Sequence, residues 1–246
     1  MLKEIRTSRQ ATVIFSILAI GIVIVTLATP YAHRIQDNEN RLLRNVFSNT
    51  SLPAMDTLLS DVLFVAFDTE TTGVNPNYER IIEIAAVKFK NGKILEEKSW
   101  LVNPEKFIPK GVQNIHKTTP EMVEDQPIFK KIYPEFARFV AGSVLLAHNA
   151  PFDVKFVQIE AGRCHYMLPP NDVIDSLRLF RRTYPTLKSH SLAAVAEFLN
   201  IKSGQFHRAA DDSVYMARIL KMFRHLGAKA TLAELYELAG GKTAFN

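Results

Sequence analysis

The chain reads VLFVAFDTE over residues 62–70. An unbroken apolar run rich in Val and Phe is typical of a strand that is buried on both faces of a sheet. Because side chains alternate along a strand, Asp68 and Glu70 would project together from one face near its end. Two adjacent carboxylates repel each other, and a divalent metal ion would resolve that repulsion, although a solvated acidic strand end is the ordinary alternative.

The sequence that follows predicts an α/β domain. Residues 81–90 and 93–102 flank Asn91-Gly92, which is typical of a hairpin with a tight primed turn. A second short apolar run, residues 144–147, predicts another buried strand. Apolar residues at helical spacing predict helices near residues 129–140, 151–160, 175–183, 191–199 and 208–224. This order of strands and helices indicates a mixed sheet covered by helices.

A second polar cluster follows the 144–147 run and reads HNAPFD over residues 148–153. Pro151 is expected to open a helix, so that Asp153 lies in its first turn. An acidic residue at this position interacts favourably with the helix dipole. Taken alone, Asp153 needs no other explanation.

A third cluster reads HRAADD over residues 207–212. His207 lies just before a predicted helix, and Asp212 lies inside it, five residues further on. A surface histidine and an acidic residue near a helix start are each common. Three such clusters in one chain, each after a buried strand or at the start of a helix, indicate a shared site.

The ordered set of clusters resembles the His-containing branch of the DEDD (DnaQ-like) 3′–5′ exonucleases. This family includes the proofreading epsilon subunit of bacterial DNA polymerase III, ribonuclease T and oligoribonuclease. Residues 67–73, FDTETTG, resemble its first motif, residues 148–153 its second, and His207 with Asp212 its third. The resemblance covers about residues 62–224. Shorter stretches are also similar to the family: RIIEI at 80–84, LVNP at 101–104, IHKT at 115–118 and SHSL at 189–192. Lys117 departs from the pattern, because relatives commonly have Gly at this position.

The resemblance implies a ribonuclease H-like fold, a mixed β-sheet flanked by helices, and an enzyme that hydrolyses phosphodiester bonds. It implies that two divalent cations, Mg²⁺ or Mn²⁺, are held by four carboxylates: Asp68, Glu70, Asp153 and Asp212. Hard oxygen ligands suit these ions. His207 would act as general base on the attacking water, and an imidazole is suited to that task near neutral pH. Asp211 is the rival of Asp212, and the family's five-residue spacing from His207 selects Asp212.

Further residues are candidates for binding the substrate: Thr69, Thr71, His116, His148 and Asn149. The two threonines would lie on the loop nearest the terminal sugar, and the resemblance suggests that His116 touches the terminal nucleotide. His148 and Asn149 would position either the strand–helix loop or that nucleotide. Basic residues between 178 and 188 could follow the phosphates of a bound strand, or they could form a solvated helix face.

The N-terminal part predicts a membrane anchor. Residues 11–29 carry no charge and would form a helix about 28 Å long, close to the roughly 30 Å thickness of the bilayer core. A cleaved signal peptide is disfavoured because Pro30 makes a poor cleavage site, and a buried core helix because the run has no polar stripe. We expect a single-pass protein of the inner (cell) membrane. Its expected parts are a basic tail (1–10), a transmembrane helix (11–29), a juxtamembrane connector (30–60), an exonuclease domain (61–226) placed in the cytoplasm, and a short helical tail (227–246).

Composition narrows the class of protein. A hydrophobic content of 47% excludes a disordered chain, and a single cysteine excludes an intramolecular disulfide framework. The formal net charge of +5 mildly favours a polyanionic partner.

The sequence therefore predicts a membrane-anchored, metal-dependent 3′–5′ exonuclease. It would act on nucleic acids with a single-stranded 3′ end, DNA preferred, and release nucleoside 5′-monophosphates. An exoribonuclease of the ribonuclease T or oligoribonuclease kind, a non-catalytic tethered nucleic-acid-binding module and a subunit that works with a DNA polymerase or repair partner are the alternatives. A non-catalytic module would be expected to have lost a ligand or the histidine, and all five positions are present.

Overall fold

The computed structural model describes residue 34, residues 36–200 and residues 229–245. The chain divides into two compact units, Met1–Leu42 and Leu43–Asn246, and the described residues 36–42 of the first are helical. Within the described ranges, no helix combines the length and apolar character needed to cross a membrane. The predicted span at residues 11–29 lies outside those ranges, as does the third motif with His207 and Asp212.

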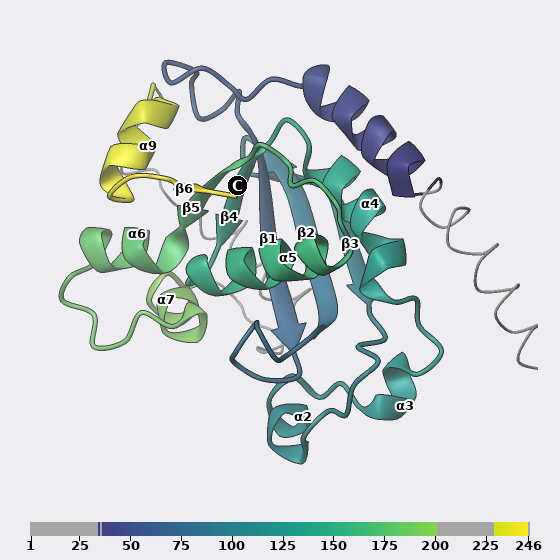
Figure 1. The fold of residues 1–246 in the computed structure, drawn as a ribbon. Helices are drawn as coiled ribbons and strands as arrows, with labels where there is room; N and C mark the ends of the chain where they lie inside the picture. Colours follow the sequence, from purple (N-terminus) through teal and green to yellow (C-terminus); the bar gives the residue numbers. More distant parts are fainter. Residues whose placement is uncertain (1–33, 35, 201–228, 246) are drawn as a thin grey trace, which may run out of the picture. The chain divides into compact units, whose positions relative to one another are not determined.

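The second unit is built on a six-stranded mixed sheet in the order β3-β2-β1-β4-β5-β6 (Figure 1). Its strands are β1 (Leu63–Thr71), β2 (Ile81–Lys90), β3 (Lys93–Leu101), β4 (Val144–Ala147), β5 (Asp172–Asp175) and β6 (Thr243–Ala244). The first three strands pair antiparallel, β4 and β5 continue parallel to β1, and β6 pairs antiparallel with β5. The predicted ribonuclease H-like mixed sheet is confirmed.

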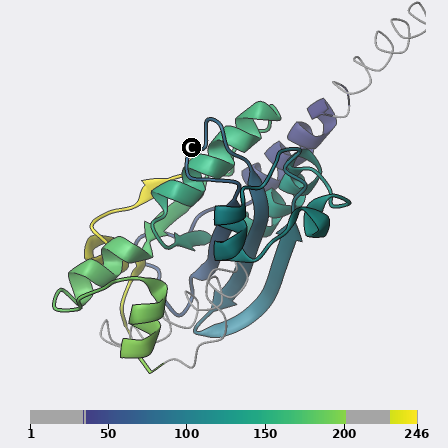
Figure 2. The same cartoon turned by 90° about the horizontal axis from the view of Figure 1, so that it is seen from below.

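Helices cover both faces of this sheet, as Figures 1 and 2 show from two directions. On one face, α4 (Phe129–Val140) and α5 (Pro151–Arg163) pack with β1 and β2 around a large apolar core. On the other face, a second core includes residues of α6 (Ser176–Thr183), α7 (Leu192–Phe198) and α9 (Leu232–Leu238). Two short helices, α2 (Lys110–His116) and α3 (Pro120–Val123), lie in the connection between β3 and α4.

Strand β1 explains why the run at residues 62–67 is apolar without interruption. Val65 and Phe67 enter the core under α4 and α5, whereas Phe64 and Ala66 enter the core on the opposite face. A strand covered on both faces needs apolar residues at every position rather than at alternate ones. Beyond Phe67 the same alternation continues with polar residues, and it is here that the first motif lies.

Several predicted elements are found as expected. The β2–β3 hairpin turns at Asn91 and Gly92, whose φ angles of 49° and 69° are both positive, as a primed turn requires. Helix α4 and strand β4 have the predicted limits, 129–140 and 144–147. Helix α5 begins at Pro151 as predicted and continues three residues further than expected, to Arg163.

The C-terminal residues add two features that the sequence did not predict. Strand β6 extends the sheet beside β5, which was itself missed because only Val173 and Ile174 of its four residues are apolar. Phe245 is fully buried, and its ring lies 5.9 Å from that of Phe67, measured between centroids. The last described residues therefore complete the core beneath the first motif.

Two arginines of the suggested phosphate-binding stretch hold this C-terminal segment. Arg178 donates to the Gly241 carbonyl and Arg182 to the Leu238 carbonyl, each at 2.8 Å. Leu238 is the last residue of α9, where backbone carbonyls lack helical partners, and Gly241 lies in the turn that follows the helix. We therefore assign these two side chains a structural role in securing α9.

Candidate active site

The first and second motifs meet at Thr69 and Asp153. The Thr69 amide and hydroxyl both donate to Oδ1 of Asp153, at 2.9 and 2.7 Å. Thr69 projects from the face of β1 that carries Phe67, and Asp153 lies in the first turn of α5, which covers that face. The strand therefore fixes the position of the helix carboxylate directly.

Burial changes the pKa of the Asp153 carboxyl group. Its side chain is only 2% exposed, and this desolvation raises the pKa of the carboxyl group, against the lowering effect of the two Thr69 hydrogen bonds. The nearby Asp175 carboxylate raises the pKa further. A buried acidic group of this kind is stabilised in its charged form by a cation.

Asp68 and Glu70 lie on the opposite face of β1 from Thr69, as the strand alternation requires. Both are partly exposed, whereas Thr69 and Thr71 are buried. The register places Glu70 directly across from Glu83 of β2. The common orientation of Asp68 and Glu70 thus follows from the observed strand.

Glu83 is a site neighbour that the sequence reasoning missed. It is 1% exposed, and its Oε1 accepts a 2.7 Å hydrogen bond from Ser99 on β3. Among the described residues, its Oε2 has no hydrogen-bond partner. A Glu inside the apolar run IIEIAAV was a signal that could have identified it.

The four predicted metal ligands are only partly within the described structure. Asp68, Glu70 and Asp153 are described, and Asp212 is not. In the described part of the chain, no three His, Cys, Asp or Glu side chains form a group that could hold a metal ion. The hard oxygen donors of the three described carboxylates nevertheless suit Mg²⁺ or Mn²⁺ better than soft metals.

Asp175 holds the loop of the second motif. Its Oδ1 accepts hydrogen bonds from the backbone amides of Asn149 (3.1 Å), Ala150 (3.4 Å) and Leu177 (3.0 Å). The last of these caps α6, and the other two secure the turn in which Asn149 adopts a left-handed φ of 65°. One carboxylate thus joins two strand ends and fixes the entry to α5. Its place at the end of a four-residue strand gave little sequence signal.

The predicted substrate residues His148 and Asn149 lie in this secured loop. Nδ1 of His148 is 3.0 Å from the Ser176 hydroxyl, and burial lowers the pKa of His148 to about 4. The imidazole is therefore neutral at physiological pH. The Asn149 side chain is exposed.

His116, the predicted nucleotide contact on α2, is buried. Its Nδ1 accepts a 3.0 Å hydrogen bond from the Thr118 amide, so the ring proton of the neutral form lies on Nε2. Burial lowers the pKa of this group and favours that neutral form. Nε2 has no partner among the described residues.

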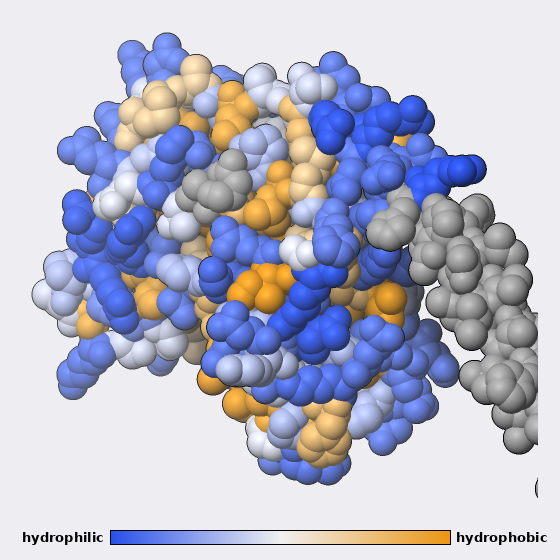
Figure 3. Space-filling view, viewed as in Figure 1, coloured by the Kyte–Doolittle hydropathy of each residue, from blue (hydrophilic) through white to orange (hydrophobic). Residues whose placement is uncertain are grey.

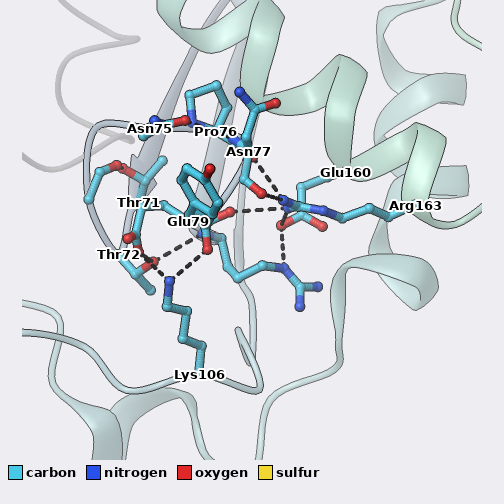
Figure 4. A network of polar contacts seen from close by, with 12 residues as sticks. Thr71, Thr72, Asn75, Pro76, Asn77, Glu79, Lys106, Glu160 and Arg163 are labelled. Atoms are coloured by element: carbon cyan, nitrogen blue, oxygen red, sulfur yellow. Dashed lines mark hydrogen bonds and ion pairs between the residues drawn. The ribbon is translucent and has the colours of Figure 1, made fainter.

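The loop after β1 is held by a network of polar contacts (Figure 4). Thr71 donates to the Gly73 carbonyl at 2.6 Å, so the hydroxyl protons of both Thr69 and Thr71 are used within the protein. Glu79 accepts hydrogen bonds from Thr72 and from Lys106, and the Lys106 bond lowers the pKa of the Glu79 carboxyl.

Helix α5 secures the same loop from the other side. The Arg163 guanidinium donates to three loop carbonyls, those of Pro76 (2.9 Å), Asn77 (2.7 Å) and Glu79 (3.1 Å). Glu160, which is 1% exposed, pairs with Arg80 at 2.6 Å and with Arg163 at 3.3 Å. The helix that carries Asp153 therefore also fixes the loop that follows Asp68 and Glu70.

Comparison with known proteins agrees with this geometry. The RNase T model of the exonuclease family matches residues 65–220. The chain belongs to this exonuclease family. Its domain is that of a 3′–5′ exonuclease, as the motif resemblance implied.

Two relatives illustrate the extent of the match. The chain is 38% identical over 167 residues to DNA polymerase III subunit epsilon of Treponema pallidum, covering 67% of this chain and 78% of that protein. It is 40% identical over 164 residues to the PolC-type DNA polymerase III of Caldanaerobacter subterraneus subsp. tengcongensis, covering 66% of this chain. The match spans only 12% of the length of that polymerase.

Solved structures share the fold. Exonuclease X, in complex with 5′ overhanging duplex DNA, is 27% identical with a TM-score of 0.55 and is matched over 70% of this chain and 98% of its own. A zinc-bound complex of Escherichia coli exonuclease I with single-stranded DNA has a TM-score of 0.64 at 19% identity, over 72% of this chain and 43% of that one. The latter likeness concerns the fold alone.

Proposed function

We propose that the chain is a membrane-anchored, metal-dependent 3′–5′ exonuclease that releases nucleoside 5′-monophosphates from single-stranded 3′ ends, with DNA preferred. The observation that carries the proposal is the double hydrogen bond between Thr69 and Asp153. It joins the first and second motifs in a chain that belongs to the exonuclease family.

Four carboxylates would hold the divalent cations: Asp68, Glu70, Asp153 and Asp212. When bound, two such ions supply an activated water and stabilise the charge that develops on the phosphate and the leaving oxygen. The chain's own contribution is to place the oxygen ligands. Thr69 orients the Asp153 carboxylate, and Asp175 fixes the loop from which α5 starts.

His207 is the proposed general base, which accepts the proton of the attacking water. His148 is unsuited to that role because its pKa of about 4 makes it too weak a base near neutral pH. Because the proposed degradation runs in the 3′–5′ direction, the free 3′ end of the substrate must lie near the loop after β1. Nε2–H of His116, which has no partner among the described residues, is a candidate donor to the terminal nucleotide, and the exposed Asn149 of the second motif is a candidate contact.

DNA as substrate is supported by what similar proteins are and bind. One is a DNA polymerase III subunit, and another was solved with duplex DNA that carries an overhang. A DNA polymerase or repair partner is part of the proposal for the same reason. The membrane anchor rests on the uncharged run at residues 11–29 and on the Lys and Arg residues that flank it. We propose an inner-membrane location with the nuclease domain in the cytoplasm.

The activity can be tested with the full chain purified in mild detergent. We expect 5′-labelled single-stranded DNA to be shortened from its 3′ end with Mg²⁺ or Mn²⁺, and RNA of the same sequence to be shortened more slowly. Faster digestion of RNA would favour the exoribonuclease alternative. Nicking of circular DNA would contradict an exonuclease.

The anchor needs a separate experiment. We expect the full chain to remain in the membrane fraction after carbonate extraction. Recovery of a mature chain that begins after residue 29 would show that the segment is a signal peptide instead.

A further inference from the structure

Three side chains stand out among the described residues by their exposure. Val74, Tyr78 and Phe107 are 83%, 73% and 74% exposed, whereas no other large apolar side chain of the described ranges exceeds the 56% of Leu95. Single exposed apolar residues need no explanation, but three on two neighbouring segments are candidates for a binding surface. We call these three residues the exposed apolar set.

A lysine joins the two segments that carry this set. Nζ of Lys106 donates to the Tyr78 carbonyl at 2.6 Å and to the Glu79 carboxylate at 2.8 Å. Lys106 directly precedes Phe107 in the chain, so the aromatic residue 107 is tied to the loop that carries Tyr78. The close-up in Figure 4 shows Lys106 directed toward Glu79 and Thr72.

The surroundings are held rigidly. Arg163 binds the backbone between Pro76 and Glu79 through three carbonyls, and Ile108, the residue after Phe107, is buried at 1% exposure. The aromatic side chains are therefore presented to solvent from an ordered backbone. Figure 3 shows apolar side chains among hydrophilic ones at the lower end of this face, over α2 and the loops beside it.

The position of the set points to its ligand. Val74 lies four residues after Glu70, at the carboxyl end of the strand that carries Asp68 and Glu70. Cationic side chains lie near both rings in the sequence: Arg80 follows Tyr78 by two residues, and Lys106 and Lys110 flank Phe107. Arg80 pairs with Glu160 and Lys106 with Glu79. Aromatic rings with cations between them are typical of surfaces that bind single-stranded nucleic acids without sequence preference.

We propose that Tyr78 and Phe107 form a stacking platform for unpaired bases of the substrate strand, upstream of the nucleotide that is removed. The assignment rests on the proposed function, because it supposes that the strand enters the site beside the loop after β1. Every base offers a flat apolar face, so the platform would hold DNA or RNA of any sequence.

A protein partner fits this surface less well. A stable protein interface buries about 800 Å² on each side and involves roughly 20 to 30 residues. Three exposed apolar side chains are too few for such an interface. They suffice for two bases.

The test measures binding apart from hydrolysis. The full chain in detergent is mixed with a fluorescent single-stranded oligothymidine of about a dozen nucleotides in EDTA, and its anisotropy gives Kd. We expect the double variant Tyr78→Ala/Phe107→Ala to raise Kd by roughly 10- to 100-fold, since stacking on one ring strengthens binding by about tenfold. Tyr78→Phe, which keeps the ring, should bind like the wild type.

Two controls separate the platform from the active site. Leu95→Ala removes an exposed apolar side chain from β3 and should leave Kd unchanged. Thymidine 5′-(4-nitrophenyl phosphate), which has no upstream bases, should be hydrolysed at the wild-type rate by the double variant. Wild-type Kd in the double variant, or an equal loss in Leu95→Ala, would overturn the platform. If the wild type hydrolysed neither this compound nor single-stranded DNA in Mg²⁺ or Mn²⁺, the proposed function would be overturned. The Kd comparison, made in EDTA, would still decide the platform.

Discussion

Thr69 donates two hydrogen bonds to one oxygen of Asp153, across 84 positions of sequence. The backbone bond depends only on the course of β1, and the side-chain bond depends on the hydroxyl. Because the two residues belong to different motifs, this contact sets the distance between a strand end and a helix start. Replacing a group that orients a metal ligand in this way commonly lowers metal affinity or activity by about 10- to 100-fold.

Replacing the Thr69 hydroxyl tests that contact. Thr69→Val keeps the shape and the amide bond but removes the 2.7 Å hydroxyl bond to Asp153. We expect activity to fall about 10- to 100-fold, with a weaker apparent affinity for Mn²⁺. Thr69→Ser retains the hydroxyl and should stay within a few-fold of wild type. Equal Mn²⁺ titration curves for Val and Ser would show that the hydroxyl does not position the carboxylate.

Asp175 should matter for stability. Asp175→Ala removes the acceptor of three backbone amides, and we expect the free energy of unfolding in urea to fall by about 2–3 kcal/mol. Asp172→Ala, on the same strand, removes an ion pair with Lys242 and one hydrogen bond from the Tyr236 hydroxyl, and it should cost less, about 1 kcal/mol. Similar losses for the two variants would contradict the role assigned to Asp175.

The buried histidine predicts how stability depends on pH. The pKa of His148 is about 4 in the folded protein, and about 6.5 in the unfolded chain. The unfolded state therefore binds the proton first as pH falls, so stability is lost from about pH 6.5 downward and levels off below about pH 4.

His148→Gln isolates this contribution. Between about pH 7.5 and pH 5, we expect the wild type to lose about 2 kcal/mol more unfolding free energy than the variant does. Urea titrations at the two pH values provide the measurement. Parallel losses in both proteins would mean that His148 is protonated equally in the folded and unfolded states.

Replacing Lys117 by glycine should stabilise the fold. Lys117 ends α2 with φ 61° and ψ 8°, a left-handed conformation that favours glycine. This backbone explains why relatives commonly have Gly at this position, the pattern from which Lys117 departs. Lys117→Gly should raise the free energy of unfolding by about 1 kcal/mol. Asn114→Gly, within the same helix, should lower it by a few tenths of a kcal/mol, roughly the difference between the helix propensities of Asn and Gly. A destabilised Lys117→Gly would show that the lysine side chain outweighs the backbone strain.

Local sequence signals predicted the parts of the site that depend on one element at a time. The alternation of β1 sufficed to place Asp68 and Glu70 on one face, and Pro151 sufficed to place Asp153 in the first turn of α5. The primed turn at Asn91 and Gly92 was equally local. In each case the deciding residues lie within a few positions of one another.

The contacts that hold the site together could not be predicted in this way. Arg163 reaches carbonyls more than 80 positions away, and any exposed arginine near a helix end would look the same in the sequence. Phe245 packs on Phe67 from the far end of the chain, and neither residue carries a sign of its partner. Asp175 acts through backbone amides, which nearly every residue has, so no residue type in the sequence reveals the contact.

Asp153→Asn tests the central claim, a carboxylate metal site that drives 3′–5′ hydrolysis, most directly. The variant keeps an oxygen to accept the Thr69 hydrogen bonds but loses the charge that would bind a cation. The measurement is the rate at which the full chain shortens 5′-labelled single-stranded DNA in Mn²⁺, with and without excess EDTA. We predict that the wild type stops in EDTA and that Asp153→Asn is slower by about a thousandfold or more in Mn²⁺. Wild-type rates in Asp153→Asn, or undiminished activity of the wild type in EDTA, would contradict the account.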